Sequence, residues 1–423
     1  MTRFLLWFFL LSAGLTAFSQ KDCLQQQYQL QLLQKYPQLS TGYNSIEKFT
    51  QSALPVLSGI NGSGTGEAVP AMITIPVVVH VLWNSNVQNI SDAQIQSQLD
   101  VLNADYSGKN ADRSKIPSYF AGLAADCGIQ FGLAKSDPRG NSTTGVVRKQ
   151  TAIQSFGFDD AVKHAANGGD DAWDADSYLN IWVCNMAGGI QGYSSIPGSP
   201  KDIDGVVINA GVFGTINTSG PFNKGRTTVH EIGHWLNLRH IWGDALCGDD
   251  KVDDTPNQQA ATRGCVSGEK FSCGSTAHGD MYMNYMDFTD DACMFMFTNG
   301  QRERMRKLFE AGGPRNAILL SNGLKGDGLP LQMPPVQGLV VMPDFNVVLY
   351  PNPASSGITI HAKEGIDYIG KSVIIYNRIG QAVKTVILTA AQQQIDISNL
   401  QNGLYFIRID GIKVKAMTKF VKQ

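Results

Sequence analysis

The sequence predicts an α/β domain followed by a small antiparallel β-sandwich. Three observations carry this prediction: strand-like runs that alternate with helical patterns up to about residue 325, a Pro- and Gly-rich linker at 326–340, and a change of pattern at 341–423. Alternating strands and helices are typical of an α/β domain. Short β-type runs divided by Gly, Asn, Pro and Ser, as found in 341–423, are typical of an antiparallel sandwich.

Residues 1–19 predict a secretory signal peptide. Arg3 supplies a positive start, Phe4–Leu11 is apolar, and the small residues Ala17 and Ser19 stand at the −3 and −1 positions of a cleavage site. A transmembrane anchor would need about 20 apolar residues, and this run is shorter. We therefore expect export and no membrane span in the mature protein. Export also permits disulfides among the seven cysteines.

Residues 20–70 predict a helix followed by a flexible segment. Leu24, Tyr28 and Leu32 lie near helical spacing, and the Gly- and Ser-rich run at 58–70 is typical of a linker. An exposed glycine-rich stretch before a compact domain is where proteases cut most easily. We interpret 20–70 as a removable pro-segment, although its composition suits a plain N-terminal extension equally well.

The compact domain is expected at 71–325 and opens with a buried, β-branched strand at 73–83. A helix follows, with Ser91 as its N-cap and Leu99 among the apolar residues of one face. Further strands are predicted at 128–134, 178–185 and 204–214. The 34 basic and 36 acidic residues nearly cancel, so the composition gives no reason to expect a nucleic-acid partner.

The segment 227–244 carries the chemistry that the sequence predicts. His230 and His234 are four residues apart, so on a helix both imidazoles project from one face and can bind one metal ion. Glu231 follows the first histidine and can reach a water molecule in an open coordination position. Because zinc lowers the pKa of such a water, we expect Glu231 to act as the general base.

His240 is the expected third ligand, but only if the helix ends early. On a continuous helix, a residue six positions after His234 lies about 600° further around the axis and points away from the metal. Asn237 lies between them and tolerates the left-handed conformation in which helices often end. We therefore expect a bend near Asn237 that lets His240 complete a three-histidine site. A chance HExxH is the alternative, and a third histidine at this spacing, in a chain with only seven, argues against it.

The sequence HEIGHWLNLRH at 230–240 resembles the extended zinc-binding motif of the metzincins, HExxHxxGxxH. With its flanks, it resembles the pappalysin family, in particular its bacterial cytophagalysin-like branch, over roughly residues 73–310. The resemblance implies a twisted mixed β-sheet with an active-site helix, a zinc cofactor, and hydrolysis of protein or peptide substrates. Asn237 stands where most metzincins have Gly.

The resemblance also implies roles for residues beyond the motif. NYMDFTDDACM at 284–294 resembles the Met-turn, with Met286 as a hydrophobic floor beneath the imidazoles. Two residues on, many metzincins have a Tyr that hydrogen-bonds the transition state, whereas Phe288 lacks the hydroxyl. Asp291 corresponds to an acid of the S1′ pocket that favours Arg or Lys after the scissile bond.

The connectivity of the cysteines does not follow from the sequence alone, but the same resemblance implies a role for each of them. Family pairing implies two disulfides between the zinc helix and the Met-turn, Cys247–Cys273 and Cys265–Cys293. Cys127 and Cys184 are left as a further pair or as buried thiols, of which we favour the thiols. Cys23 stands where relatives carry a pro-segment cysteine that can ligate zinc and block its open position. Its neighbours differ from the family pattern, so latency through Cys23 stays one of two open alternatives.

The acidic loop CGDDKVDDTP at 247–256 predicts a calcium site. Carboxylates crowded with few basic partners suit a hard cation with oxygen ligands, and the resemblance implies calcium binding here. The candidate ligands are Asp250, Asp254 and Thr255, and a solvated acidic turn is the alternative.

The C-terminal segments LYPNPASSGITI, IIYNRIGQAV and GLYFIRI resemble the sorting domain of type IX secretion. With the signal peptide, this tail implies export across the inner and outer membranes to a secreted or cell-surface location, with the type IX machinery as a partner. An adhesive β-sandwich is the competing interpretation.

The combined prediction is an exported zinc endopeptidase that is made as a zymogen and prefers Arg or Lys at P1′. Two other classes stay open. One is a zinc-containing adhesion protein that has lost catalysis, which Phe288 and the sandwich would suit. The other is a different metal-dependent hydrolase, such as an amidase of cell-wall peptides.

Overall fold

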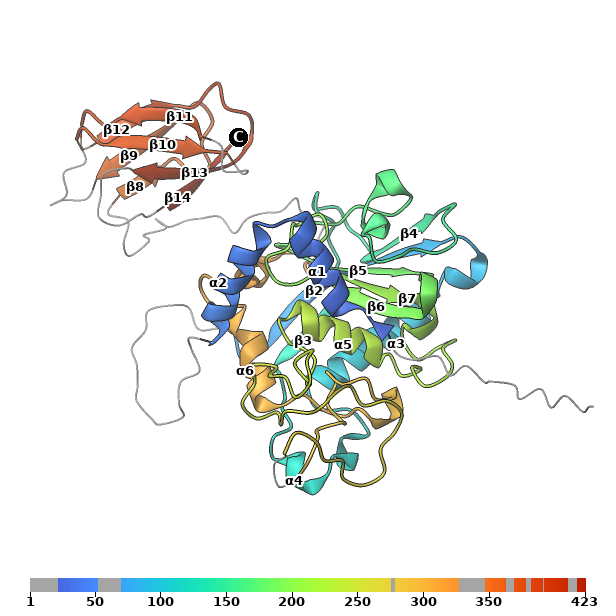
Figure 1. The fold of residues 1–423 in the computed structure, drawn as a ribbon. Helices are drawn as coiled ribbons and strands as arrows, with labels where there is room; N and C mark the ends of the chain where they lie inside the picture. Colours follow the sequence, from blue (N-terminus) through green and yellow to red (C-terminus); the bar gives the residue numbers. More distant parts are fainter. Residues whose placement is uncertain are drawn as a thin grey trace, which may run out of the picture. The chain divides into compact units, whose positions relative to one another are not determined.

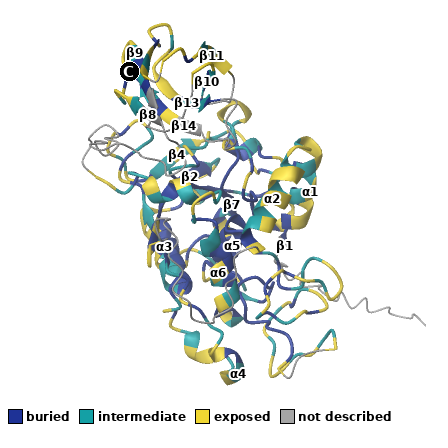
Figure 2. Cartoon of the chain, turned by 90° about the vertical axis from the view of Figure 1, so that its left-hand side faces the viewer, coloured by how far each residue is buried: buried dark blue, intermediate teal, exposed yellow. Residues whose placement is uncertain are grey.

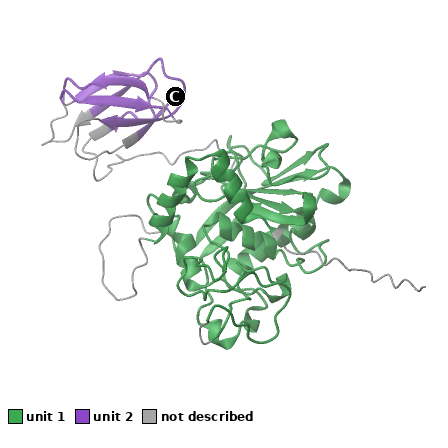
Figure 3. Ribbon diagram, viewed as in Figure 1, with its two compact units in different colours: residues 1–331 green, residues 332–423 purple. Residues whose placement is uncertain are grey.

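The computed structural model forms two compact units, Met1–Leu331 and Gln332–Gln423 (Figure 3). The structure describes residues 22–51, 70–274, 278–326, 347–362, 369–377, 382–390, 392–409 and 417–423. The predicted signal peptide, the Gly- and Ser-rich end of the predicted pro-segment and almost all of the predicted linker lie outside these described residues.

A seven-stranded mixed β-sheet forms the centre of the first unit (Figure 1). Its strands are β1 (Asp22–Cys23), β2 (Ile73–Trp83), β3 (Ile129–Leu133), β4 (Val146–Gln150), β5 (Leu179–Cys184), β6 (Ile190–Ser194) and β7 (Val206–Asn209). They run in the order β1-β6-β7-β5-β2-β3, and β4 also pairs with β2. Neighbouring strands are parallel except for β6 and β7. The mixed sheet that the resemblance implied is therefore confirmed.

The two faces of the sheet are covered by different parts of the chain. On one face lie α3 (Asp92–Tyr106) and α5 (Arg226–Trp235), which share an apolar core with alternate residues of β2 and β5. The opposite face buries Trp182 and Val207 against Tyr28 of α1 (Gln25–Lys35). Apolar runs with strand periodicity present side chains to both faces, so both faces must be covered.

Most predicted elements of this unit occur within a few residues of their expected places. Ser91 caps α3 as predicted, accepting a hydrogen bond from the backbone N–H of Gln94 at 3.1 Å. The strand expected at 204–214 is shorter, because the Asn209 side chain accepts a bond from Gly211 N and begins a 3-10 turn. Strands β1, β4 and β6 and the second N-terminal helix α2 (Leu39–Gln51) were not predicted from the sequence.

The remaining helices are short. They are α4 (Ser118–Ala121) and α6 (Asn299–Lys307), and α6 begins with a capping box in which Thr298 and Gln301 bond each other's backbone N–H. Helix α6 lies beside α2, so part of the predicted pro-segment packs on the compact domain that follows it. None of the helices in the described ranges is both long and apolar enough to cross a membrane.

The second unit is an antiparallel β-sandwich, as predicted. Its strands are β8 (Val347–Tyr350), β9 (Gly357–Ala362), β10 (Ser372–Tyr376), β11 (Ala382–Ile387), β12 (Gln392–Asp396), β13 (Gly403–Ile409) and β14 (Met417–Lys422). One sheet has the order β11-β10-β13-β14 and the other β12-β9-β8, and every neighbouring pair is antiparallel. Alternate residues such as Val373, Ile375 and Ile407 are buried in its core.

Candidate metal centre

Helix α5 carries the HExxH motif and is buried along its whole length (Figure 2). It ends as the sequence predicts: Asn237 has φ +69°, the left-handed conformation. The Leu238 N–H donates to the Gly233 carbonyl at 2.9 Å, and the Asn237 N–H donates to the His234 carbonyl at 2.9 Å. This pair of bonds is the Schellman arrangement, which satisfies the last carbonyls of a helix and turns the chain out of its axis.

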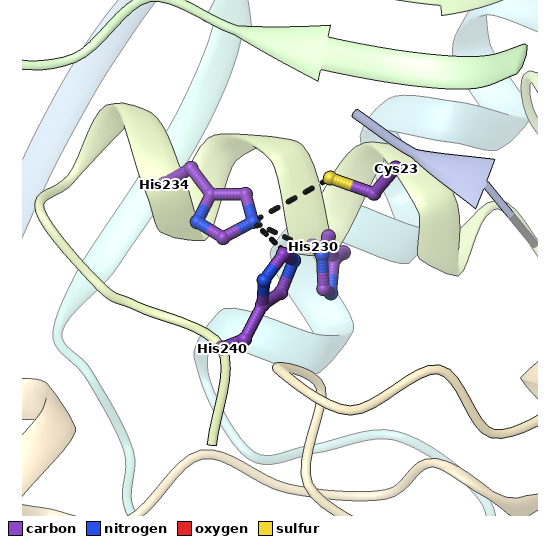
Figure 4. A group of neighbouring side chains, drawn as sticks. All are labelled: Cys23, His230, His234 and His240. Carbon is purple, nitrogen blue, oxygen red and sulfur yellow. Dashed lines mark hydrogen bonds between the residues drawn. The ribbon is translucent and has the colours of Figure 1, made fainter. Parts of the chain in front are cut away.

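The turn at Asn237 brings the third histidine back to the other two (Figure 4). The Nε2 atom of His234 lies 3.1 Å from Nε2 of His230 and 3.1 Å from Nε2 of His240. The Sγ atom of Cys23 lies 3.7 Å from the same His234 nitrogen. All four side chains are buried, and their ligand atoms lie within 4.8 Å of one another.

Each imidazole is oriented by a hydrogen bond from its other nitrogen. His230 Nδ1 donates to the Tyr285 carbonyl at 2.7 Å, and His234 Nδ1 donates to the Leu238 carbonyl at 2.9 Å. His240 Nδ1 bonds Asp244 Oδ1 at 2.5 Å. Because Nδ1 carries the proton in these bonds, the Nε2 lone pairs face one another, as metal-ligating histidines require.

The spacing of these atoms fits zinc. Nitrogen ligands about 2.1 Å from a tetrahedral ion lie roughly 3.4 Å apart, and a thiolate at about 2.3 Å lies roughly 3.6 Å from each nitrogen. The observed 3.1 Å between nitrogens and 3.7 Å from sulfur to nitrogen are close to these values. Within the residues that the structure describes, this is the single cluster of three or more His, Cys, Asp or Glu with ligand spacing.

The side chain of Glu231 lies between its own helix, α5, and the strand β6, and it is fully buried. A Cβ atom on Gly192 would come within 2.9 Å of Glu231 Cγ and 3.1 Å of Oε1. Glycine at 192 therefore makes the space that the carboxylate occupies. Gly192 is also the register partner of Cys23 in the β1–β6 pairing, so Cys23 and Glu231 both lie beside Gly192 of β6.

Met286, the predicted Met-turn residue, packs against helix α5 at Gly233. A Cβ atom on Gly233 would lie 2.5 Å from Met286 Sδ, so only glycine allows this contact. The Met286 carbonyl accepts a bond from Ile241 N at 3.2 Å, which ties the turn to the chain just after His240. The ring of Phe288 packs against His240, with centroids 4.9 Å apart.

The loop between the helix and the Met-turn is held by two disulfides. They are Cys247–Cys273 and Cys265–Cys293, the pairing that the resemblance implies. Cys127 and Cys184 are free, fully buried thiols, and burial raises the pKa of both well above the usual range.

Two of the three candidate calcium ligands, Asp250 and Thr255, bond each other, whereas Asp254 bonds the start of helix α6. Thr255 Oγ1 donates to Asp250, 2.8 Å from Oδ1 and 2.9 Å from Oδ2. Asp254 instead accepts bonds from Thr298 Oγ1 at 2.6 Å and Gly300 N at 2.8 Å, at the start of α6. Burial raises the pKa of Asp250 to about 7 against the lowering effect of Thr255.

Asp291 lies buried at the start of α5. Its Oδ2 accepts bonds from Lys224 N at 2.8 Å and Arg226 N at 3.2 Å. Arg226 continues into an ion-pair network with Asp105 and Asp112, at 3.2 and 2.6 Å. The expected S1′ acid therefore lies at the positive end of the metal-binding helix, where a negative charge is stabilised.

Two residues of the site were missed by the sequence analysis. Asp244 orients His240, and Trp242 stacks on the His240 ring with centroids 4.3 Å apart. An acid four residues after a candidate ligand was the available signal for Asp244. A cavity of about 210 Å³ opens here and is lined by Cys23, Leu24, Gln26, Gln27, His240, Trp242, Asp244, Arg263 and Phe288.

The mixed sheet, the buried HExxH helix with its bend, and the methionine floor together define a metallopeptidase of the metzincin type. The comparisons with known proteins agree. Residues 164–310 match the peptidase M43 model, described as pregnancy-associated plasma protein-A. Residues 348–423 match the secretion system C-terminal sorting domain.

Curated relatives extend the match over most of their own length. An extracellular metalloprotease of Pyricularia oryzae is 34% identical over 262 residues, covering 58% of this chain and 78% of that protein. An extracellular metalloprotease of Arthroderma benhamiae is 30% identical, covering 63% of this chain and 86% of that protein.

Solved structures match with higher identity. Mature mirolysin of Tannerella forsythia in complex with a cleaved peptide has a TM-score of 0.58 and 48% identity, and the match covers 59% of this chain and 96% of that chain. A promirolysin mutant from the same organism has a TM-score of 0.62 and 43% identity, with 70% of this chain and 96% of that chain covered. This chain belongs to the pappalysin family of metallopeptidases and carries a type IX sorting domain for export to the medium or the cell surface.

Proposed function

We propose that this protein is a zinc endopeptidase made in a latent form, in which Cys23 closes the coordination position that catalysis needs. The convergence of three Nε2 atoms and one Sγ atom carries this proposal. A metallopeptidase site with three protein ligands keeps a position for water and substrate. The Cys23 thiol would fill that fourth position.

The chemistry divides between the metal and the protein side chains. Zinc bound in this site would supply a Lewis acid that polarises the scissile carbonyl and acidifies water. Glu231 takes a proton from the attacking water and later delivers it to the leaving amine. His230, His234 and His240 would hold the ion, and their Nδ1 hydrogen bonds fix the rings in place. Met286 supports the three rings from below.

Replacing the base separates metal binding from catalysis. We expect activated Glu231→Ala to bind zinc as the wild type does and to cleave casein more slowly by roughly 10²–10⁴-fold. The exposed Glu303→Ala is the matched control and should leave cleavage unchanged. Full cleavage by Glu231→Ala would overturn the mechanism. Wild-type protein that binds zinc and cuts no peptide would support the adhesion alternative, and cleavage confined to peptidoglycan fragments would support the amidase.

The pro-segment is positioned to deliver Cys23. Strand β1 forms the edge of the sheet and pairs in parallel with β6, and Cys23 is the partner of Gly192 beside Glu231. Helix α1 then follows and buries Tyr28 and Leu32 on the sheet. These contacts support a latent state that ends when the segment is removed.

We also propose that Asp291 favours Arg or Lys at P1′. The support is a buried carboxylate at the start of the helix that carries the metal ligands. A basic side chain in a partly desolvated pocket would be attracted to it. Asp291→Asn should lower kcat/KM for a peptide with Arg at P1′ by about tenfold, a difference of about 1.4 kcal/mol, and leave a peptide with Leu at P1′ almost unaffected. Equal losses for both peptides would instead indicate a structural role at the helix start.

The acidic loop is the proposed calcium site, with Asp250, Asp254 and Thr255 as ligands. Asp250 is buried and, among the described residues, forms no ion pair with a basic side chain, so a bound cation would stabilise its charge. Calcium should therefore raise the Tm of the wild type more than that of Asp250→Asn. An equal rise in both would exclude this loop as the site.

A further inference from the structure

A second contact of the pro-segment lies away from the histidines. Glu47 of α2 forms a two-point interaction with Arg304 of α6, with Oε1 accepting from Nη1 at 2.9 Å and Oε2 accepting from Nη2 at 2.7 Å. Arg239 Nη2 lies 3.4 Å from the same Oε2. A guanidinium that faces a carboxylate through two parallel bonds has the geometry in which arginine selects carboxylates.

The charges at this contact are unequal. Two guanidinium groups face one carboxylate, and in the described part of the chain no other acid forms an ion pair with either arginine. Burial alone would raise the pKa of Glu47, but the hydrogen bonds and charge of Arg304, with the charge of Arg239, lower it. Without Glu47, both arginines would lose the one acid with which they form an ion pair in the described residues, and Arg304 is only 4% exposed. Such a pair is stabilised by any carboxylate that can reach it.

The arginines are held by the catalytic part of the chain and not only by Glu47. Arg304 Nε donates to the Asn237 carbonyl at 2.7 Å, at the residue whose left-handed turn ends the metal-binding helix. The Asn237 side chain in turn donates to Thr50 Oγ1 at 3.1 Å. Arg239 is the residue directly before His240. One guanidinium edge is therefore fixed in position before any carboxylate arrives.

A cavity adjoins Arg304, whereas Arg239 does not line it. It has a volume of about 380 Å³, and its lining combines the basic residues Arg304 and Lys251 with Thr50, Gln51 and the acidic residues Asp249, Asp253 and Asp254. Thr50 and Gln51 belong to α2, so removal of α2 would remove part of the cavity wall beside Arg304.

We propose that Arg239 and Arg304 form a carboxylate-binding site outside the metal centre, which Glu47 fills in the full chain and which takes a carboxylate from another molecule when Glu47 is absent. The ligands are small carboxylates and the Asp or Glu side chains of peptides. The opening of this site in the active enzyme rests on the proposed removal of the pro-segment. The binding of a carboxylate by the two arginines does not depend on that removal.

The test is rescue by acetate in the full chain. Glu47→Ala removes a CH₂–COO⁻ group, which acetate replaces. In a Glu231→Ala background, which prevents self-digestion, acetate should raise the Tm of Glu47→Ala by about 2–4 °C above the effect of chloride at equal ionic strength. The protein with Glu47 intact should show no such rise, because its site is filled. The double variant Glu47→Ala/Arg304→Met should also show none, because the two-point partner is gone.

No acetate-specific rise in Glu47→Ala, or an equal rise in the double variant, would overturn the proposal. If Glu47→Ala does not fold, the comparison moves to Glu47→Gln, which keeps the packing of α2 and loses the charge. Acetate then competes with the amide, so a smaller rise is expected, again absent when Arg304→Met is added. These measurements need neither bound zinc nor peptide cleavage, so their failure is distinct from failure of the proposed peptidase function.

Discussion

Two segments cover the histidine site, and they are attached in opposite ways. The N-terminal segment 22–51 brings Cys23 to the metal ligands, and the loop 247–293 brings Phe288 to the ring of His240. Both contribute residues to the cavity beside His240. The loop is cross-linked by two disulfides, whereas the described part of the N-terminal segment is held only by noncovalent contacts.

The noncovalent contacts of the N-terminal segment are nevertheless specific. Tyr28 is fully buried, donates a hydrogen bond to Asp160 Oδ1 at 2.8 Å, and accepts one from Lys163 Nζ at 3.0 Å. Glu47 adds its ion pair at the far end of the segment. The difference teaches what cleavage of the chain between the two segments would do. The disulfides would keep the loop in place, whereas the hydrogen bonds and ion pairs of the N-terminal segment would be lost as its local concentration falls.

The largest effect on stability is expected from loss of a disulfide in the loop 247–293. Replacing Cys247 and Cys273, which are 26 residues apart, by Ala should lower the free energy of unfolding by about 3–4 kcal/mol. Latency should persist, because Cys23 does not depend on this disulfide. The measurements are thermal unfolding and casein cleavage before activation. Leu246→Ala, at an exposed neighbouring residue, is the control. Loss of latency in the double variant would show that the loop, too, keeps the site closed.

In the N-terminal segment 22–51, the largest effect on latency is expected from loss of the Cys23 thiol. Cys23→Ala should increase the cleavage activity of the unprocessed chain on the order of 100-fold, equivalent to about 2.7 kcal/mol of lost thiolate binding. Cys127→Ala removes a buried thiol elsewhere and should leave latency intact. An unprocessed Cys23→Ala protein that stays inactive would mean that the backbone pairing of β1, and not the thiol, blocks the site.

The smallest effect concerns the pH dependence of the Glu47 ion pair. The pKa of Glu47 is lower in the folded chain, so its stabilisation is fully present above the ordinary glutamate pKa of about 4.3 and is lost as pH falls through the lower folded value. At neutral pH, Glu47→Gln should lose about 1–2 kcal/mol, reduced from a fully buried pair because solvent reaches part of it. The Tm difference from wild type should shrink on acidification below pH 4. A difference that stays constant with pH would assign the loss to packing.

The sequence predicted most of the strands because each has its own local pattern. The β-branched run at 73–83 forms β2 without a change of bounds, and the runs of the C-terminal unit form its seven strands. Strand β1 has only two residues, too few for any periodicity, and β6 contains glycine where Glu231 needs space. The role of Asp254 could not be predicted from a local pattern either. Its carboxylate caps α6 by accepting bonds from Thr298 and Gly300, which follow it by 44 and 46 residues in the sequence.

By itself, the sequence determined the metal-binding helix and its end. The four-residue spacing of His230 and His234 and the left-handed tolerance of Asn237 are local properties of the backbone, and they place His240 without reference to the rest of the chain. Only the tertiary structure decided what surrounds that site. Cys23 meets His234 across 211 residues of sequence, and Glu47 meets Arg304 across 257. Such contacts depend on how the sheet edge and helices close on one another, and no pattern within a short window carries that information.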